Sequence, residues 1–306
     1  MTGALHIAFC GGGSGGHVTP AIAIAEAAWK LRPDARLSFF TSDRDIDRTI
    51  MHSWLESLGE SADNVTVVPL PLTSSRQRLR YLAHVWRSFS QCRRSFRDNP
   101  PDVVLGMGGF ASVPGVLAAR SCGIQRHLFE ANRTPGRANR WLRYCSMMAF
   151  VGWPWKKRHS WWRTLETGIP LRHRLNKRST AFAIEQNIFR ILILGGSQGA
   201  MTLNDLVLRS IDSVASNQSS EFVQQLRIVH QTGLADKVKV AEAWQRAGIV
   251  ADVQPFLSDV PASLRAADVV ISRAGAVTLA EIAAAERASI LVPLPSAKDN
   301  HQAANA

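Results

Sequence analysis

The chain has 306 residues, 46% of them hydrophobic and 20% charged, so it can bury sizeable cores and has the length of about two domains. Its 36 lysines and arginines outnumber 24 aspartates and glutamates, and the net charge of +12 favours polyanionic partners, either nucleic acid or an anionic membrane surface. No apolar run approaches the roughly 20 residues that span a bilayer, and no signal-peptide pattern is present, so we expect a cytoplasmic protein.

The first predicted element is a buried strand, Leu5 to Phe9, which leads into the glycine loop CGGGSGGHVTP. A glycine turn between a strand and a helix lets the backbone approach a phosphate, whose charge is met by the helix N-terminus. We expect the following helix to run from Pro20 to Leu31, with Thr19 as its N-cap and proline at the first helical position.

This first glycine loop admits several interpretations. It satisfies the dinucleotide pattern G-x-G-x-x-G, for which Asp43 or Asp45 could serve as the ribose acid, but the pattern alone is weak. His17 directly after the glycines indicates a catalytic group at a phosphate-binding helix start. The alternative is a histidine that makes only a local hydrogen bond.

Further strands and helices alternate along the first half, which predicts a mostly parallel sheet with helices on both faces. The other strands predicted there are Leu37 to Thr41, Val65 to Leu70, Val103 to Leu105, Gln125 to Phe129 and Met148 to Val151. The four cysteines, which form no CxxC pair or zinc pattern, are expected to be small buried hydrophobic residues: Cys10, Cys92, Cys122 and Cys145.

Two basic, aromatic segments concentrate the positive charge. Residues 76–97 place apolar side chains on one helical face and arginines elsewhere, which suits either a membrane interface or a helix packed on the core. Residues 153–163 combine four tryptophans with lysine and arginine, which suits a membrane interface or plain packing. No nucleic-acid-binding module accompanies this charge, so we expect no nucleic-acid partner.

The alternation restarts in the second half, after a link expected near Thr167 to Pro170. The strand Ile191 to Leu194 leads into a second glycine loop, GGSQGA, at Gly195 to Ala200. The later strands predicted are Leu226 to His230, Val269 to Ile271 and Ser289 to Val292. Two such units predict two nucleotide-fold domains facing a cleft, residues 1–168 and 169–306.

Six motifs occur together in one order along nearly the whole chain. They are GGGSGGHVTPAIAIAE from Gly11, GMGGFASVPG from Gly106, FEANRTPGRANRWL from Phe129, LILGGSQGAMTLN from Leu192, HQTG from His230, and SRAGAVTLAEIAAA with VPLPSAKDNHQAANA at the end. This set resembles the MurG family of glycosyltransferases, family 28, which adds N-acetylglucosamine from UDP-N-acetylglucosamine to the undecaprenyl-linked muramyl-pentapeptide of peptidoglycan.

The resemblance implies a GT-B fold, with two Rossmann-like domains, the acceptor bound by the first and the donor by the second. The donor-binding residues that it implies are Arg172, Gly196, Ser197, Gln198, Gly199, Leu257, Glu281, His301 and Gln302. The implied acceptor-binding residues are Ser14, Gly15, Gly16, Gly108, Gly109, Phe110 and Asn132, with Glu130, Gly136 and Asn139 as structural supports. From the residues alone, the preferred interpretation of Glu281 is a capping box with Thr278.

The expected chemistry is a single displacement with inversion at the anomeric carbon. The acceptor's C4 hydroxyl needs a base, and we nominate His17, because histidine titrates near neutral pH. The helix behind GGSQ and Arg172 would stabilise the departing UDP without a metal or cofactor. The resemblance implies a peripheral protein on the cytoplasmic face of the cell membrane, with an anionic membrane surface and other cell-wall synthesis proteins as candidate partners.

Three departures from the family pattern leave alternatives open. The family's H-E-Q-N is Phe129-Glu130-Ala131-Asn132 here, and its G-N-P is Gly168-Ile169-Pro170. The sequence ends at Ala306, where the family continues, so we expect an incomplete second sheet with uncovered apolar surface. The alternatives are an inactive or partner-dependent membrane-attached scaffold, a GT-B enzyme with another lipid acceptor, and a nicotinamide oxidoreductase.

Overall fold

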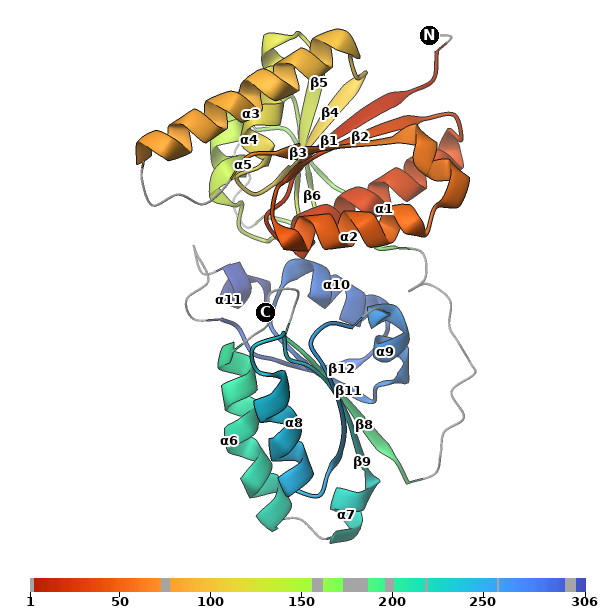
Figure 1. Ribbon diagram of the computed structural model, residues 1–306, viewed down its shortest axis with the longest axis vertical. Helices are drawn as coiled ribbons and strands as arrows, with labels where there is room; N and C mark the ends of the chain where they lie inside the picture. The colour runs from red at the N-terminus through yellow and green to blue at the C-terminus, as the bar shows by residue number, and fades with distance from the viewer. Residues whose placement is uncertain are drawn as a thin grey trace. The chain divides into compact units, whose positions relative to one another are not determined.

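The computed structural model describes residues 3–72, 78–155, 162–172, 187–195, 201–217, 220–257, 259–294 and 301–306. The chain divides into two compact units, Met1–Arg172 and His173–Ala306. Each unit carries its own parallel sheet with helices packed on it (Figure 1). The α/β class with mostly parallel sheets is thereby confirmed.

The first unit is built on a seven-stranded sheet with the order β3-β2-β1-β4-β5-β6-β7. Its strands are β1 (His6–Gly11), β2 (Arg36–Ser42), β3 (Val65–Leu70), β4 (Val103–Gly108), β5 (Gln125–Glu130), β6 (Ala149–Val151) and β7 (Thr164–Glu166). All the pairings between them in the described part of the chain are parallel. The carboxyl ends of all seven strands therefore lie at one edge.

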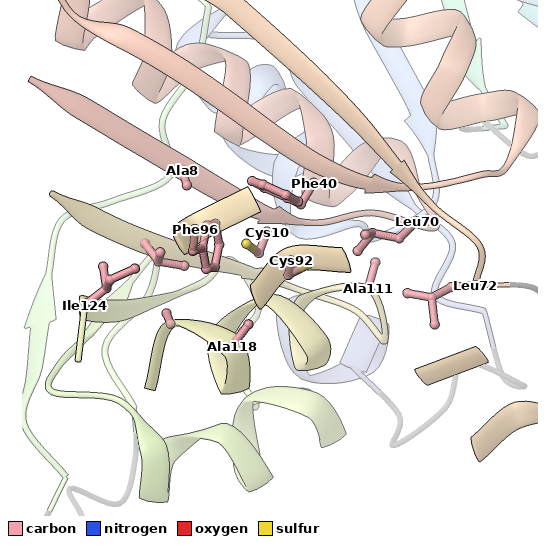
Figure 2. Close-up of a cluster of buried hydrophobic side chains, with 12 residues drawn as sticks. Ala8, Cys10, Phe40, Leu70, Leu72, Cys92, Phe96, Ala111, Ala118 and Ile124 are labelled. Carbon is pink, nitrogen blue, oxygen red and sulfur yellow. The ribbon is translucent and has the colours of Figure 1, made fainter. Parts of the chain in front are cut away.

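Helices cover both faces of this sheet (Figure 1). They are α1 (Gly15–Leu31), α2 (Asp45–Glu56), α3 (Arg78–Asp98), α4 (Ser112–Ser121) and α5 (Arg137–Leu142), with short 3₁₀ turns at Gly59–Asn64 and Arg143–Cys145. Because side chains alternate along a strand, Cys10 and Phe40 lie in the core formed with α3 and α4, which Figure 2 shows. On the opposite face Phe9 stacks on Phe39, and Phe39 meets Trp54 of α2.

The start of α1 corrects our expectation. The helix begins at Gly15 with Ser14 as the N-cap, so Thr19 is not the cap and Pro20 lies inside the helix. The two glycines allow the first turn to form directly after the loop. Pro20 lacks the N–H that would bond to the carbonyl of Gly16, and Gly16 is an exposed residue. The helix N-terminus consequently includes His17.

The predicted strands are confirmed, and two were missed. β7 has three residues, all exposed, and β10 (Val250–Gln254) shows no clean alternation. The four cysteines are free thiols, and only Cys10 and Cys92 are buried, so the prediction of buried cysteines holds for two of the four. The basic segment is helical from Arg78 onward.

The second unit contains a five-stranded parallel sheet with the order β10-β9-β8-β11-β12 among the described residues. The strands are β8 (Phe189–Leu194), β9 (Leu226–Gln231), β10, β11 (Val269–Ser272) and β12 (Ala288–Leu291). The helices are α6 (Met201–Asn217), α7 (Ser220–Gln225), α8 (Lys237–Arg246), α9 (Val260–Ala266), α10 (Ala276–Ala284) and α11 (His301–Asn305). On β12, an edge strand of this sheet, Ile290 is 56% exposed, so apolar surface is uncovered there.

Trp155 and Trp162 belong to the tryptophan-rich segment of the first unit. Their rings lie 4.8 Å apart, and both side chains pack with the core under β5 and β6. Packing therefore accounts for these two tryptophans. Residues 156–161 of the same segment lie outside the described residues.

Candidate functional site

Three sequence motifs meet at the carboxyl edge of the first sheet. The first glycine loop (residues 11–16) follows β1, the GMGGF loop (residues 106–110) ends β4, and the FEAN motif (residues 129–132) ends β5. Since β1 pairs with β4 and β4 pairs with β5, the three loops are neighbours. The topology thus brings most of the predicted acceptor-binding residues to the carboxyl edge of the sheet. Ligand sites in open α/β sheets usually lie at this edge.

His17 lies in the first turn of α1 and is partly buried. Its Nδ1 lies 3.0 Å from the carbonyl oxygen of Met107. A carbonyl can only accept, so Nδ1 carries the proton and Nε2 of the neutral ring carries the lone pair. The ring is therefore held in the tautomer in which Nε2 can accept a proton.

The imidazole packs directly against the backbone of Gly108 and Gly109. A β-carbon added to Gly108 would lie 3.1 Å from His17 Cε1, and one added to Gly109 would lie 2.5 Å from the carbonyl oxygen of Gly12. Both glycines have positive φ, +90° and +72°. These positions require glycine for backbone conformation and for space, which brings the two loops into van der Waals contact around His17.

Glu130 organises the third loop. Its buried carboxylate accepts hydrogen bonds from the backbone N–H and side-chain amide of Asn132, from the N–H of Gly136 and from the side-chain amide of Asn139. The structural roles predicted for Glu130, Gly136 and Asn139 are thereby confirmed. Asn132 is partly exposed at this edge, with its Nδ2 donating to Glu130.

The other predicted acceptor residues lie around the start of α1. Ser14 is the N-cap, but its side chain makes no capping hydrogen bond, and Gly15 and Gly16 begin the helix. The first N–H groups of a helix have no intrahelical partner, so this turn suits an anion. Phe110 flanks the loop, because a β-carbon on Gly13 would lie 2.7 Å from its ring.

The N–H of Gly13 is bonded to a carboxylate. It donates to Asp47 Oδ2 at 2.6 Å, within the first unit's interior. A dinucleotide-binding loop would direct its amides at a pyrophosphate instead. Asp43 and Asp45, the candidate ribose acids, pair with Arg48 at the surface. The geometry gives no support to the oxidoreductase alternative.

Some of the predicted donor-binding residues belong to the part of the chain that the structure describes, and others do not. Gly196, Ser197, Gln198 and Gly199 lie outside the described residues, between the end of β8 and the start of α6. Leu257 is buried, and its neighbour Phe256 is 46% exposed.

Glu281, His301 and Gln302 come from elements at the carboxyl edge of the second sheet. Burial raises the pKa of Glu281, on α10, to about 7. Gln302 Oε1 accepts from the N–H of Leu294, which follows β12, and Asn305 donates to the carbonyl of Ala274, which follows β11. These bonds tie α11 to the ends of both strands.

Arg172 ends the first unit. Its guanidinium Nε lies 3.4 Å from Glu26 Oε1 on α1, and Trp54 Nε1 donates to the same oxygen. Arg172, which is predicted to bind the UDP diphosphate, therefore pairs with Glu26 of α1 in this structure.

A buried polar network in the second unit was not predicted, although its histidine lies in the HQTG motif. Burial lowers the pKa of His230 to about 4, so the ring is neutral at pH 7. Trp244 donates to its Nδ1, so Nε2 donates to Asn204 Oδ1. Asn204 in turn donates to the carbonyl of Thr232 and to Asp236. The network anchors the first turn of α6.

Two further observations concern only the described residues. No group of three or more His, Cys, Asp or Glu side chains is arranged there as metal ligands would be. None of the helices described is both long and apolar enough to cross a membrane.

Comparisons with known proteins match both units. The N-terminal domain of glycosyltransferase family 28 matches residues 7–149, and the C-terminal domain of that family matches residues 190–306. A UDP-N-acetylglucosamine–N-acetylmuramyl-(pentapeptide) pyrophosphoryl-undecaprenol N-acetylglucosamine transferase from Trichlorobacter lovleyi is 34% identical, over 97% of this chain and 80% of its own.

Solved structures agree with the sequence matches. The crystal structure of Acinetobacter baumannii MurG superposes with a TM-score of 0.68 at 27% identity, covering 98% of this chain and 81% of that one. The glycotransferase of kitacinnamycin gives a TM-score of 0.65 at 15% identity, covering 99% and 83%, which is a likeness of fold alone.

Proposed function

Because the chain belongs to glycosyltransferase family 28, and within it to the MurG family, we propose that it transfers N-acetylglucosamine from UDP-N-acetylglucosamine to undecaprenyl-diphospho-N-acetylmuramyl-pentapeptide in peptidoglycan synthesis. The observation that carries the chemistry is the hydrogen bond between His17 Nδ1 and the Met107 carbonyl. With Nδ1 bonded in this way, Nε2 is the ring nitrogen that would accept a proton at the edge where the three loops are neighbours.

In the proposed reaction, His17 Nε2 takes the proton of the acceptor's C4 hydroxyl. As that proton leaves, the C4 oxygen forms a bond to the anomeric carbon, and the bond from that carbon to the diphosphate oxygen breaks with inversion. General-base assistance of this kind contributes about 10²–10⁴-fold to a rate. UDP departs carrying the electron pair of the broken bond.

The acceptor's lipid diphosphate is assigned to Ser14, Gly15 and Gly16, at the N-terminus of α1. A 17-residue helix concentrates positive partial charge at its first turn, and Gly16 is exposed there. Gly108 and Gly109 pack against His17 and Phe110 packs against Gly13, and the proposal adds Asn132, from the neighbouring loop, to this group. The muramyl sugar would be oriented by these groups.

For the donor, the proposal assigns the uridine ribose hydroxyls to the Glu281 carboxylate and uracil to the backbone at Leu257. His301 and Gln302 would contact the transferred sugar. The UDP diphosphate is assigned to Gly196, Ser197, Gln198 and Gly199 with Arg172.

The proposal includes peripheral attachment to an anionic membrane surface at the cytoplasmic face. There the protein would also meet other cell-wall synthesis proteins. Its support is α3, on which Leu82 and Trp86 are 61% and 67% exposed. Trp86 also lines a pocket of about 350 Å³, together with Phe89, Ser90, Arg93, Arg94, Arg97 and Asp98. Exposed apolar side chains beside arginines suit the boundary between headgroups and acyl chains.

The test is transfer of labelled N-acetylglucosamine from its UDP conjugate to a short-chain analogue of the lipid-linked acceptor, without added metal. Formation of the disaccharide lipid is the expected result. If folded protein binds UDP-N-acetylglucosamine but gives no product, the scaffold alternative replaces the enzyme. Transfer only to an acceptor that lacks the muramyl-pentapeptide would identify another lipid acceptor.

A further inference from the structure

A buried carboxylate lies beneath the first glycine loop. Asp47, in the first turn of α2, is fully buried, whereas Asp45 in the same turn is exposed and pairs with Arg48. In the sequence both residues belong to the charged run DRDID, which predicts that both are exposed. Asp47 is nevertheless in line with the buried face of α2, since Met51 and Trp54 follow at intervals of four and three residues.

The contacts of Asp47 fix the peptide groups at Gly13. Asp47 Oδ2 accepts hydrogen bonds from the N–H of Gly13 at 2.6 Å and from Ser42 Oγ at 2.5 Å. Arg44, the N-cap of α2, donates from Nη1 to the carbonyl of Gly13 at 3.1 Å. Residues at the start of α2 thus hold both the N–H and the carbonyl of one loop residue.

The same clamp reaches the GMGGF loop. The Arg44 guanidinium lies 5.0 Å from the centre of the Phe110 ring, and Gly13, at φ +91°, packs against that ring. A β-carbon on Gly12 would collide with Asp47 Oδ2 at 2.4 Å. The carboxylate, both glycines and the aromatic ring therefore form one close-packed unit.

This unit leads directly to His17. Gly13 precedes Ser14, the N-cap of α1, and the N–H of His17 donates to the carbonyl of Ser14 at 3.1 Å. A shift of the Gly13 peptide would move the first turn of α1 and, with it, the imidazole that meets Met107 and Gly109. Displacing a reacting group by about 1 Å can cost roughly 10²-fold in rate.

A buried carboxylate is expensive unless hydrogen bonds satisfy it, and Asp47 Oδ1 has none in the described part of the chain. Its position at the N-terminus of α2, beside Arg44, offsets part of that cost. An apolar residue would fill the helix face without this cost. Unlike an apolar residue, the carboxylate fixes the geometry of the glycine loop through its hydrogen bonds.

We propose that Asp47 is a positioning residue for His17 and the first glycine loop; this inference rests on the proposed transferase function. Asp47 occupies the Gly13 amide, which leaves Ser14, Gly15 and Gly16 to meet the acceptor's phosphates. It acts through the loop and does not touch substrate.

The kinetic test compares Asp47→Ala and Asp47→Asn with Asp45→Ala, which removes an exposed carboxylate from the same helical turn. Asp47→Ala should lower kcat about 10- to 100-fold while the KM for UDP-N-acetylglucosamine stays within twofold. Asp47→Asn keeps an oxygen that accepts from Gly13 and Ser42, so it should recover most of kcat. Asp45→Ala should match wild type.

A second measurement is independent of activity. In protein labelled with ¹⁵N-histidine, the His17 ring should show a protonated Nδ1 in wild type and in Asp45→Ala, and a mixture of tautomers in Asp47→Ala. Wild-type protein without transferase activity would overturn the proposed function, and this ring signal would still decide the role of Asp47.

The inference is wrong if Asp47→Ala keeps wild-type kcat and an unchanged His17 ring signal. It is equally wrong if Asp47→Asn is as impaired as Asp47→Ala and both raise the KM for UDP-N-acetylglucosamine, because general destabilisation would then explain the loss. Should Asp47→Ala fail to fold, Asp47→Asn is judged by the opposite criterion, because it keeps the acceptor oxygen. A kcat within tenfold of wild type and an unchanged His17 ring signal then support the inference, and a larger loss of kcat overturns it.

Discussion

At the scale of single residues, the hydrogen bonds of a histidine identify which ring nitrogen carries the proton, and the sequence alone does not. The Met107 carbonyl fixes the tautomer of His17, and the Trp244 N–H fixes that of His230, in the opposite sense. The first ring is partly exposed and presents a lone pair, whereas the second is buried and makes two structural hydrogen bonds. The two histidines therefore have different environments although each lies in a family motif.

Glu281 gives a prediction about pH. Burial raises its pKa to about 7, so a large part of the carboxyl is protonated at neutral pH. If the carboxylate accepts the ribose hydroxyls, affinity for UDP-N-acetylglucosamine should fall up to about tenfold per pH unit below pH 7. Calorimetric titration from pH 5.5 to 8.5 measures this, and Glu281→Gln should bind about 10- to 100-fold more weakly at pH 8 with a flatter profile.

The same burial makes an independent stability prediction. A carboxyl whose pKa is higher in the folded state binds its proton more tightly there, so its contribution to stability decreases as pH rises from 4.5 to about 7. At pH 8 Glu281→Gln should therefore unfold at higher temperature than wild type. The exposed Glu242→Gln serves as the control, and equal melting temperatures for all three proteins would contradict the argument.

At the scale of elements, the close approach of two loops is the feature that the site depends on. Gly109→Ala and Gly123→Ala form a matched pair, because both positions have φ near +72° but only Gly109 has an atom within 3 Å of an added β-carbon. Each substitution should cost about 1–2 kcal/mol for the left-handed backbone. Gly109→Ala should lose more, and also activity, because Gly12 must move.

Unfolding in urea and the transfer assay together measure this difference. The loop-contact account requires Gly123→Ala to retain kcat and Gly109→Ala to lose it. Equal stability losses with equal kcat would show that the contact between the loops has no functional consequence.

The sequence predicts this edge of the sheet well because apolar strands and glycine loops are local signals. It misses the true start of α1, because Gly15, Gly16 and His17 carry no helical apolar pattern. It also misses Asp47, whose burial depends on a loop 34 residues away. The apolar spacing of Met51 and Trp54 with Asp47 was the available signal, and the charges around it obscured that signal.

At the scale of the whole molecule, two separate units carry the two halves of one family's motifs. Their order along the chain was predictable, since each glycine loop follows an apolar strand. The exposure of the large apolar side chains in the basic segments was predictable only in part. On the basic helix α3, Leu82 and Trp86 are exposed, whereas Trp155 and Trp162 pack inside the first unit. Burial of a tryptophan depends on which surface folds over it, and local sequence does not contain that information.

Membrane attachment through α3 gives a prediction with a matched control. Leu82→Asp should weaken binding to anionic vesicles, whereas Leu234→Asp changes the same residue type at an 87% exposed position in the other unit and should not. Wild-type binding should also weaken as salt screens the charge, over a Debye length of about 8 Å at physiological ionic strength. Vesicle sedimentation measures both effects, and equal binding to neutral vesicles would contradict electrostatic attachment.

The most direct test of the account is kcat for N-acetylglucosamine transfer by His17→Ala, compared with His52→Ala. His52 is an exposed histidine on α2, paired with Glu56, so its loss should leave turnover within twofold of wild type. Loss of the base at His17 should lower kcat by about 10²–10⁴-fold. Near-normal turnover by folded His17→Ala would contradict the assignment of the base and the role given to the loops around it.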